Sequence, residues 1–263
     1  TEEEKNLIND KTYKKLVDFK LIENKKDKIS KVLSLRKLLG INNLCDARCL
    51  LETQGCFRKS NQQSIDYLGL LIWLKLCEKF TEKNHVEKIN LEKLKENLNY
   101  IKGLSLEAPK TFMPKLKEIF SGCGVDFQVI PDFPNVPIHG YIEKKTEKII
   151  LCLTIRYKFA DIFWFSLFHE LGHIFNGDIK QKFYDFNLNS NEKNADRFAQ
   201  ETLISPSSYR DLILRSQIDL PAIKKCAEVN KVDPGIVVGR LYHDKIIKYG
   251  KFSNERKRYC FNT

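Results

Sequence analysis

Two histidines and a glutamate lie inside the most apolar stretch of the chain, and this combination constrains the fold more than any other feature. The stretch covers residues 161–175, and its apolar residues fall on nearly every side of the helix that it predicts. Such a helix belongs in a protein interior, where an unpaired carboxylate or imidazole is costly. His169, Glu170 and His173 therefore need a partner there. We expect Asp161 to cap the start of this helix and Asn176-Gly177 to end it.

The spacing of the three polar residues predicts a metal site. His169 and His173 are four residues apart, so both imidazoles project from one face of the helix and can bind a single cation. Glu170 can stand beside that cation as a general base. Two other interpretations are a chance His-Glu-x-x-His match in a core helix and a metal site without catalytic activity.

A third ligand for such a cation is expected from Glu192. Asn191-Glu192-Lys-Asn-Ala-Asp196-Arg-Phe-Ala places Glu192 and Asp196 on one helical face, together with two small alanines. Glu192 can complete the coordination, and Asp196 can accept the ring N–H of a ligand histidine and fix its tautomer. The competing interpretation is that both acids lie on a solvated surface.

Composition excludes several other classes of protein. The chain has 263 residues, 42% hydrophobic and 30% charged, with no apolar run long enough to span a bilayer. Its net charge of +11 comes from dispersed lysines rather than an arginine-rich tract, so we do not expect direct nucleic-acid binding or a membrane partner. The absence of a signal sequence and of Cys-x-x-Cys pairs among eight scattered cysteines indicates a cytoplasmic protein.

Hydrophobic periodicity predicts an α+β fold that is mainly helical. A polar helical region comes first, and further elements follow as helices over 61–80, 90–102 and 111–121 and strands over 125–131, 139–143 and 148–156. The three strands would form a small sheet packed on the metal-binding helices. We therefore divide the chain into an α-helical, partner-binding region, residues 1–108, and a metal-binding domain, residues 109–263.

The segments that carry these motifs resemble the ImmA/IrrE metallopeptidase family. The resemblance rests on Leu151–His173, on Glu192-x-x-Ala-Asp-x-Phe-Ala, on Leu203-Ile-Ser-Pro and on Pro234-Gly-Ile-Val-Val-Gly-Arg-Leu, and it covers roughly residues 110–245. It implies a gluzincin-like zincin fold with His169, His173 and Glu192 as zinc ligands and Glu170 as catalytic base. Members cleave, or are thought to cleave, repressors, and so control mobile elements, toxin–antitoxin modules or stress responses.

Close relatives carry an Xre-type helix-turn-helix ahead of this domain, and residues 1–40 lack its turn pattern. We therefore expect a fragment, or a regulator without a DNA-binding domain of its own. The helix–turn–helix shape of residues 222–242 we assign to packing in the peptidase domain.

A few further residues have two interpretations each. His139, ahead of Gly140, either hydrogen-bonds a substrate oxygen or is structural. Arg156, Tyr157 and Lys158 either meet the substrate or end a strand in solvent. His243 we take as structural, and Trp164 with Phe165 as core.

Two functions remain open. One is a zinc endopeptidase that cleaves a repressor, antitoxin or toxin, with one Zn²⁺ per chain and Mn²⁺ or Fe²⁺ as alternatives. The other is a catalytically weak or inactive, antitoxin-like or repressor-like regulator that uses the zincin fold to bind a protein partner.

Overall fold

The computed structural model describes residues 1–53, 65–154, 158–177, 179, 183–184 and 190–259. Their contacts separate into two compact units, residues 1–83 with 130–138 and residues 84–129 with 139–262. The first boundary between the units, after residue 83, comes earlier in the chain than the domain boundary that we placed at 108–109. The reason is packing, since Leu94, Ile101 and Leu104 belong to the same hydrophobic core as the sheet and the metal-binding helix.

The N-terminal unit is helical, as expected. Its α-helices are α1 (Glu2–Leu7), α2 (Asp10–Asp18), α3 (Lys28–Leu39), α4 (Ala47–Thr53) and α5 (Tyr67–Thr81). Helix α5 corresponds to the helix predicted over 61–80, of which residues 61–64 lie outside the described part of the chain. Residues 130–138 join this unit through a hydrogen bond from the Asp66 N–H to the Asn135 carbonyl, at 2.9 Å.

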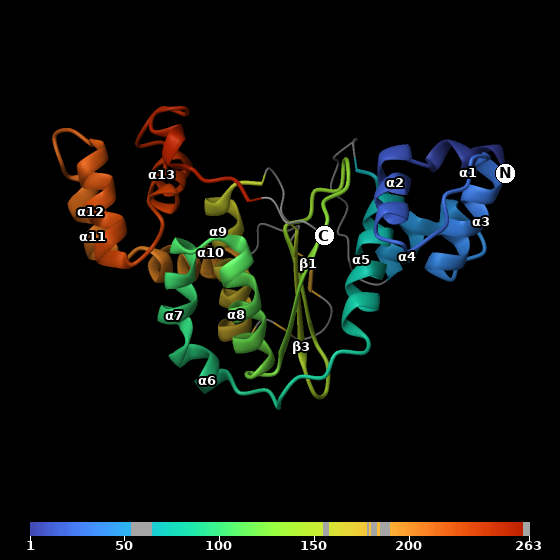
Figure 1. Cartoon of the computed structure of the whole chain (residues 1–263), viewed down its shortest axis with the longest axis horizontal. Coiled ribbons are helices and arrows are strands. Elements are labelled where there is room, and N and C mark those ends of the chain that lie inside the picture. Colours follow the sequence, from blue (N-terminus) through green and yellow to red (C-terminus); the bar gives the residue numbers. More distant parts are fainter. Residues whose placement is uncertain (54–64, 155–157, 178, 180–182, 185–189, 260–263) are drawn as a thin grey trace. The chain divides into compact units, whose positions relative to one another are not determined.

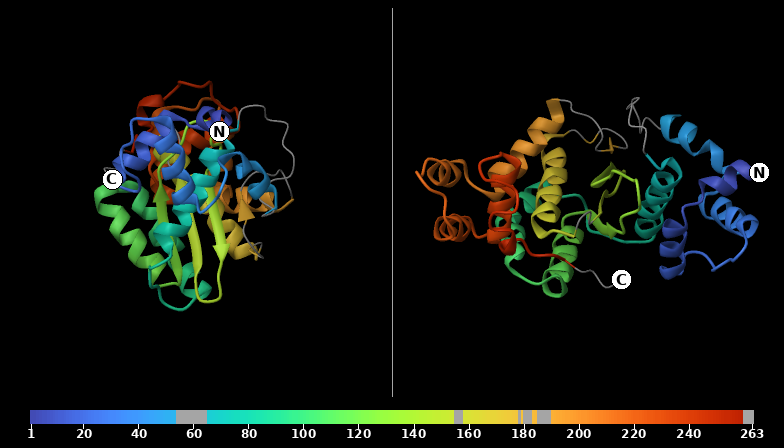
Figure 2. Two further views of the ribbon diagram at one scale, coloured as in Figure 1. Left: turned by 90° about the vertical axis from the view of Figure 1, so that its right-hand side faces the viewer. Right: turned by 90° about the horizontal axis from the view of Figure 1, so that it is seen from above.

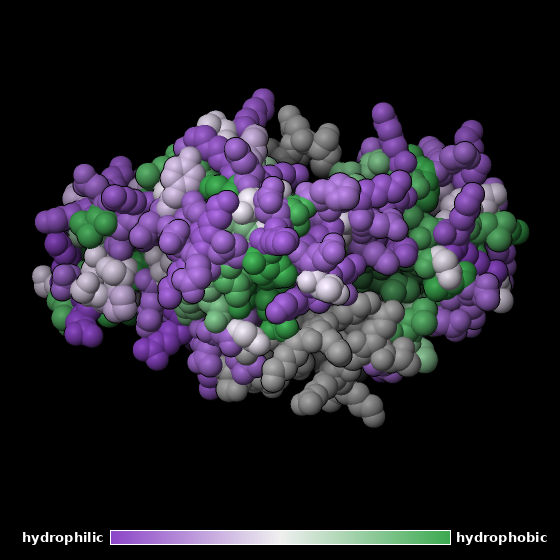
Figure 3. Space-filling model, turned by 90° about the horizontal axis from the view of Figure 1, so that it is seen from below, coloured by the Kyte–Doolittle hydropathy of each residue, from purple (hydrophilic) through white to green (hydrophobic). Residues whose placement is uncertain are grey.

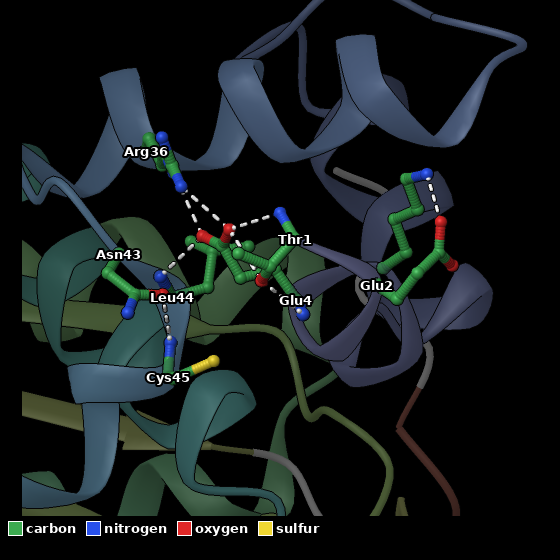
Figure 4. A network of polar contacts seen from close by, with 8 residues as sticks. Thr1, Glu2, Glu4, Arg36, Asn43, Leu44 and Cys45 are labelled. Atoms are coloured by element: carbon green, nitrogen blue, oxygen red, sulfur yellow. Dashed lines mark hydrogen bonds and ion pairs between the residues drawn. The ribbon is translucent and has the colours of Figure 1, made fainter.

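A buried carboxylate ties the first helices of this unit together. The Glu4 side chain is fully buried and accepts hydrogen bonds from Nε and Nη2 of Arg36 on α3, at 2.9 and 2.6 Å. It also accepts the backbone N–H of Leu44 at 2.9 Å and the Thr1 hydroxyl at 3.1 Å (Figure 4). The Arg36 and Leu44 hydrogen bonds outweigh burial and hold the pKa of Glu4 far below its ordinary value.

The second unit contains the expected sheet. Strands β1 (Val125–Ile130), β2 (Gly140–Lys144) and β3 (Ile149–Thr154) match the three predicted strands, and the two-residue β4 (Phe183–Tyr184) adds a fourth, in the order β1-β3-β2-β4. β2 pairs antiparallel with β3 and with β4. Helices α6 (Leu91–Glu96), α7 (Leu98–Gly103) and α8 (Pro109–Ser121) precede the sheet. The α+β expectation is confirmed.

Helix α9 (Ala160–Asn176) is the central helix of this unit, contacting β2, β3, α10 (Ser190–Leu203) and α13 (Pro234–His243). Helices α11 (Pro206–Ile213) and α12 (Leu220–Asn230) lie between α10 and α13 in the chain. Figures 1 and 2 show α9 between the sheet and the later helices. Burial of 13 of its residues confirms that this helix is internal. It ends at Gly177 in a left-handed conformation, as predicted.

The start of α9 differs from our expectation. Its N-cap is Phe159, and Asp161 lies inside the first turn, where it pairs with Arg256 instead of capping the helix. The C-terminal segment fastens this end: the Ala160 N–H donates to the Lys257 carbonyl at 2.9 Å, and the Trp164 indole donates to the Tyr259 hydroxyl at 2.7 Å. Hydrogen bonds to the C-terminal segment, far along the chain, therefore stabilise the start of α9 in place of a side-chain cap.

The surface is mainly hydrophilic on the face that is viewed from below. Hydrophilic residues cover most of the face in Figure 3, with smaller hydrophobic areas between them. Of the cysteines that the structure describes, Cys77, Cys123, Cys152 and Cys226 are buried and none is in a disulfide; Cys56 and Cys260 lie outside the described residues. Among the described helices, none is both long and apolar enough to cross a membrane.

Gly172 sets the distance between α9 and α10. A Cβ at this position would lie 2.8 Å from the Ala195 Cα, which is too close for any real contact. We predict that Gly172→Ala lowers the free energy of unfolding by about 1–3 kcal/mol, because the helices must separate. Gly103→Ala, at a helical glycine with open space around it, is the matched control and should be neutral or slightly stabilising. Urea unfolding followed by circular dichroism measures both, and equal effects would disprove the packing constraint.

The Glu4 contacts predict an acid-sensitive N-terminal unit. A carboxylate with a depressed pKa contributes stability above its unfolded pKa, and this contribution is lost as pH falls below about 4.5, the ordinary value for glutamate. Glu4→Gln should therefore destabilise residues 1–53 at pH 7, and its difference from wild type should narrow towards pH 3. Hydrogen exchange resolved by peptide measures this. Glu3→Gln, at an exposed glutamate of the same helix, is the control. A constant gap for Glu4→Gln across the pH range would contradict the prediction.

Candidate metal centre

Helices α9 and α10 bring three potential ligands together. His169 and His173 lie one turn apart on α9, and Glu192 lies in the first turn of α10. One ligand atom from each, all within 4.8 Å of one another, could hold a metal ion. The Nε2 atoms of the two histidines are 3.1 Å apart, and Oε2 of Glu192 lies 3.2 Å from Nε2 of His169 and 3.6 Å from Nε2 of His173.

Asp196 fixes the orientation of the first imidazole. Its Oδ1 lies 2.8 Å from Nδ1 of His169, one helical turn after Glu192. When His169 is neutral, a carboxylate at this distance favours the tautomer with the proton on Nδ1, and the lone pair on Nε2 then faces the other two ligands. The structure thus places Asp196 where the sequence analysis expected an orienting group.

The donor set fits a cation. The lone pair on Nε2 of His169 points towards a carboxylate oxygen and a second imidazole nitrogen, an arrangement that a positive ion would satisfy. Within the described part of the chain, Oε1 of Glu192 is also buried without a hydrogen-bond partner. A metal ion bound by these three side chains would account for both features.

Ionisation states in this cluster match a metal-binding role. Burial opposes the charge of Glu192, but its contacts with the His169 and His173 imidazoles prevail and hold the pKa of its carboxyl below its ordinary value. Burial also opposes protonation of His173, yet Glu192 and the nearby Glu170 raise the pKa of this imidazole above its ordinary value. The buried carboxylate of Glu192 therefore favours a positive charge beside it.

Glu170 lies against a glycine on the neighbouring strand. A Cβ on Gly140, the first residue of β2, would come within 2.0 Å of Oε1 of Glu170, so only glycine leaves room for this carboxylate. Glu170 is 1% exposed, whereas the adjacent His139 is half-buried. Both line a cleft beside the ligand cluster. Sequence reasoning missed Gly140, although this glycine directly follows His139.

A cleft of about 490 Å³ opens beside the ligand cluster, within the size range of ligand sites. It is lined by His139, Glu170, His169, Glu192 and Asp196 and continues between α9, α10 and α13. Phe165, which we expected in the core, lines this cleft and packs on the core with its other face. His243, expected to be structural, is an exposed residue at the cleft, hydrogen-bonded to Asp244 at 2.9 Å.

The other residues singled out from the sequence lie apart from the cluster. Arg156 and Tyr157 fall outside the described residues, and Lys158 is exposed in a left-handed turn. The predicted helix–turn–helix shape appears as α12 and α13, which pack on each other, and α13 also packs on α9. Burial of Ile236, Val237, Val238 and Leu241 in α13 is consistent with packing as its main role.

The ligand cluster predicts metal-dependent stability. We expect the protein to bind about one zinc ion, and His173→Ala or Glu192→Ala to weaken binding by at least about 100-fold, since each removes one of three ligands. His243→Ala provides a matched control at an exposed histidine outside the cluster. Isothermal titration calorimetry of chelator-stripped protein measures the affinities. If zinc binds wild type and Glu192→Ala equally, the ion does not occupy this cluster.

Comparison with known proteins addresses this same part of the chain. A search of curated proteins finds no match. Residues 160–242, which run from the start of α9 almost to the end of α13, match the Peptidase_M78 family model, described as an IrrE N-terminal-like domain. The matched residues include all three candidate ligands and Glu170, and a metallopeptidase family implies a metal cofactor. The resemblance noted from the sequence is therefore confirmed over residues 160–242, which match the IrrE N-terminal-like domain of this metallopeptidase family.

Proposed function

We propose that this protein is a zinc-dependent endopeptidase that cleaves a regulatory protein, a repressor or a component of a toxin–antitoxin pair. The observation that carries the proposal is the convergence of His169, His173 and Glu192 beside a buried Glu170 at the wall of a cleft. Three protein ligands and an open side are the arrangement of catalytic zinc sites, whereas structural sites are closed by a fourth ligand.

Zinc is the metal that this ligand set favours. Two imidazoles and one carboxylate suit Zn²⁺, and Mn²⁺ or Fe²⁺ could occupy the same ligands. When bound, zinc polarises a peptide carbonyl and lowers the pKa of water. Metal analysis of protein prepared without chelator or nickel resin distinguishes the three ions.

The chain's own residues supply the proton transfers. Glu170 follows the first ligand directly, and Gly140 leaves space for its carboxylate at the cleft. In the proposed reaction Glu170 takes a proton from the attacking water and delivers it to the nitrogen of the departing peptide. His139 lines the same cleft, and we assign to it a hydrogen bond to the carbonyl oxygen of the substrate. Asp196 acts as a positioning residue through His169.

The class of substrate is inferred from the family resemblance. ImmA/IrrE-type proteins act on regulators of transcription, and we assign the recognition of the partner to the N-terminal helical unit, residues 1–83 with 130–138. In this assignment of roles, the metallopeptidase domain carries out the chemistry. Direct nucleic-acid binding is not part of the proposed function, in line with the dispersed positive charge.

We predict that the protein cuts the regulator encoded beside its own gene at a discrete position. Glu170→Gln should retain zinc and lower the cleavage rate by about 100-fold or more, because a general base typically contributes that much. Glu201→Gln, an exposed glutamate on α10, is the matched control and should cleave like wild type. Mass spectrometry of the incubated partner identifies the products.

Two outcomes would separate the proposal from its alternative. Equal cleavage by wild type and Glu170→Gln would assign the activity to a contaminant or another residue. An intact partner that binds wild type and Glu170→Gln with the same affinity would instead support a regulator that uses this fold for binding alone.

A further inference from the structure

Positive charge, which is dispersed over most of the chain, is denser in one segment of the second unit. Residues 245–258 hold six lysines and arginines and one glutamate, so they supply +5 of the chain's net charge of +11. Most of these cations are exposed, at Lys245, Lys248, Lys251, Lys257 and Arg258. The segment directly follows α13 and the residue after it, Asp244.

Hydrogen bonds and a ring contact hold the first part of this segment against the end of α13 (red in Figure 1). The Tyr242 hydroxyl donates to the Lys251 carbonyl at 2.7 Å and accepts the Gly250 N–H at 3.1 Å. The Tyr249 ring packs on the Tyr242 ring, with the two centroids 5.0 Å apart. The lysines are therefore presented from a backbone that is folded back on the helix.

Four of the six cations have no compensating carboxylate within the described part of the chain. Arg256 pairs with Asp161 at 2.7 Å, and Lys257 pairs with Asp233 at 2.5 Å. The cations that form no ion pair with any described residue are Lys245, Lys248, Lys251 and Arg258. A negatively charged partner can therefore pair with them without breaking an ion pair inside the protein.

Apolar side chains lie between these charges. Ile246 is 43% exposed and Tyr249 is 80% exposed, although both are large. A single-stranded nucleic acid could stack a base on Tyr249, but its phosphates favour the planar fork of arginine over lysine. A protein segment that carries carboxylates and apolar side chains matches both kinds of residue on this surface. The mixture therefore favours an acidic peptide over a nucleic acid.

The segment adjoins the cleft without contributing to its lining. His243, which lines the cleft, lies two residues before Lys245. Towards the other end of the segment, Arg256 binds Asp161, which also lines the cleft. A protein chain that enters the cleft can therefore continue onto this surface.

We propose that residues 245–258 form an exosite, a binding surface outside the cleft, for an acidic segment of the protein substrate. Carboxylates of that segment pair with the four cations that have no ion pair, and its apolar side chains cover Ile246 and Tyr249. The inference rests on the proposed peptidase function and gives the partner a chemical class. It adds a second contact to the recognition that we assign to the N-terminal unit.

Peptide binding tests the exosite separately from cleavage. The probes are a fluorescein-labelled repeat of Glu-Leu-Asp, a matched repeat of Gln-Leu-Asn and a labelled oligothymidine, titrated by fluorescence anisotropy into the zinc-loaded full chain. We expect the acidic peptide to bind at least about tenfold more tightly than the amide peptide at low salt, and the difference to shrink as salt rises. Glu170→Gln should bind the acidic peptide like wild type, because the surface lies outside the cleft.

Removal of charge from the segment locates the binding. Lys245→Gln combined with Lys248→Gln should weaken binding of the acidic peptide by about fivefold or more at low salt. Lys95→Gln combined with Lys110→Gln is the matched control, because it removes the same charge from exposed lysines of α6 and α8. This control should change the affinity by less than about twofold. Circular dichroism confirms that both double variants are folded.

Three results would overturn the exosite. They are equal affinity for the acidic and amide peptides, an equal effect of the two double variants, and tightest binding of the oligothymidine. Failure of the peptidase function has a different signature, namely equal treatment of the regulatory partner by wild type and Glu170→Gln. The two failures are therefore distinguishable.

Discussion

The close contact of α9 with α10 at Gly172 is the constraint on which the rest of the site depends. Gly172 lies between the two histidines in sequence, and it meets Ala195, which lies between Glu192 and Asp196. The two helices therefore lie close together where both acids must reach the imidazoles. At 3.2 Å from His169, Glu192 has little tolerance for separation, since displacement by about an ångström would take it out of hydrogen-bond and coordination range.

Bringing these groups into the interior has an electrostatic cost that the cluster itself offsets. Burial alone would neutralise Glu192, but the two imidazoles keep it ionised, and in return it favours protonation of His173. Asp196 adds a second negative charge at the outer nitrogen of His169. The result is a cluster that attracts positive charge, and a dication bound there would replace the shared protons as the partner of all three side chains.

Much of this site was predictable because its geometry is local. Helical spacing alone placed His169 with His173, and Glu192 with Asp196, while the small residues of α10 indicated close helix packing. What sequence reasoning missed depends on contacts between distant segments. Asp161 resembles a helix cap until Arg256, 95 residues later, is seen to bind it. Gly140 and the cleft-facing side of Phe165 likewise become meaningful only when β2 and α13 lie beside α9. The boundary between the two units was missed for the same reason. Helices α6 and α7 are amphipathic, and their sequence does not indicate which core they join.

Helix α9 carries two of the candidate ligands and one wall of the cleft. Because α9 is buried on its other sides, the distance between these ligands and Ile162 or Phe165 is fixed by helical geometry. A change in the position of α9 would therefore alter the ligand cluster and the cleft together. The end of α10 and the first turns of α13 contribute other side chains to the wall, at Leu203, Ile204 and Ile236. Substitutions at these three positions can reshape the cleft while the ligand geometry is preserved, because none of them lies in the cluster.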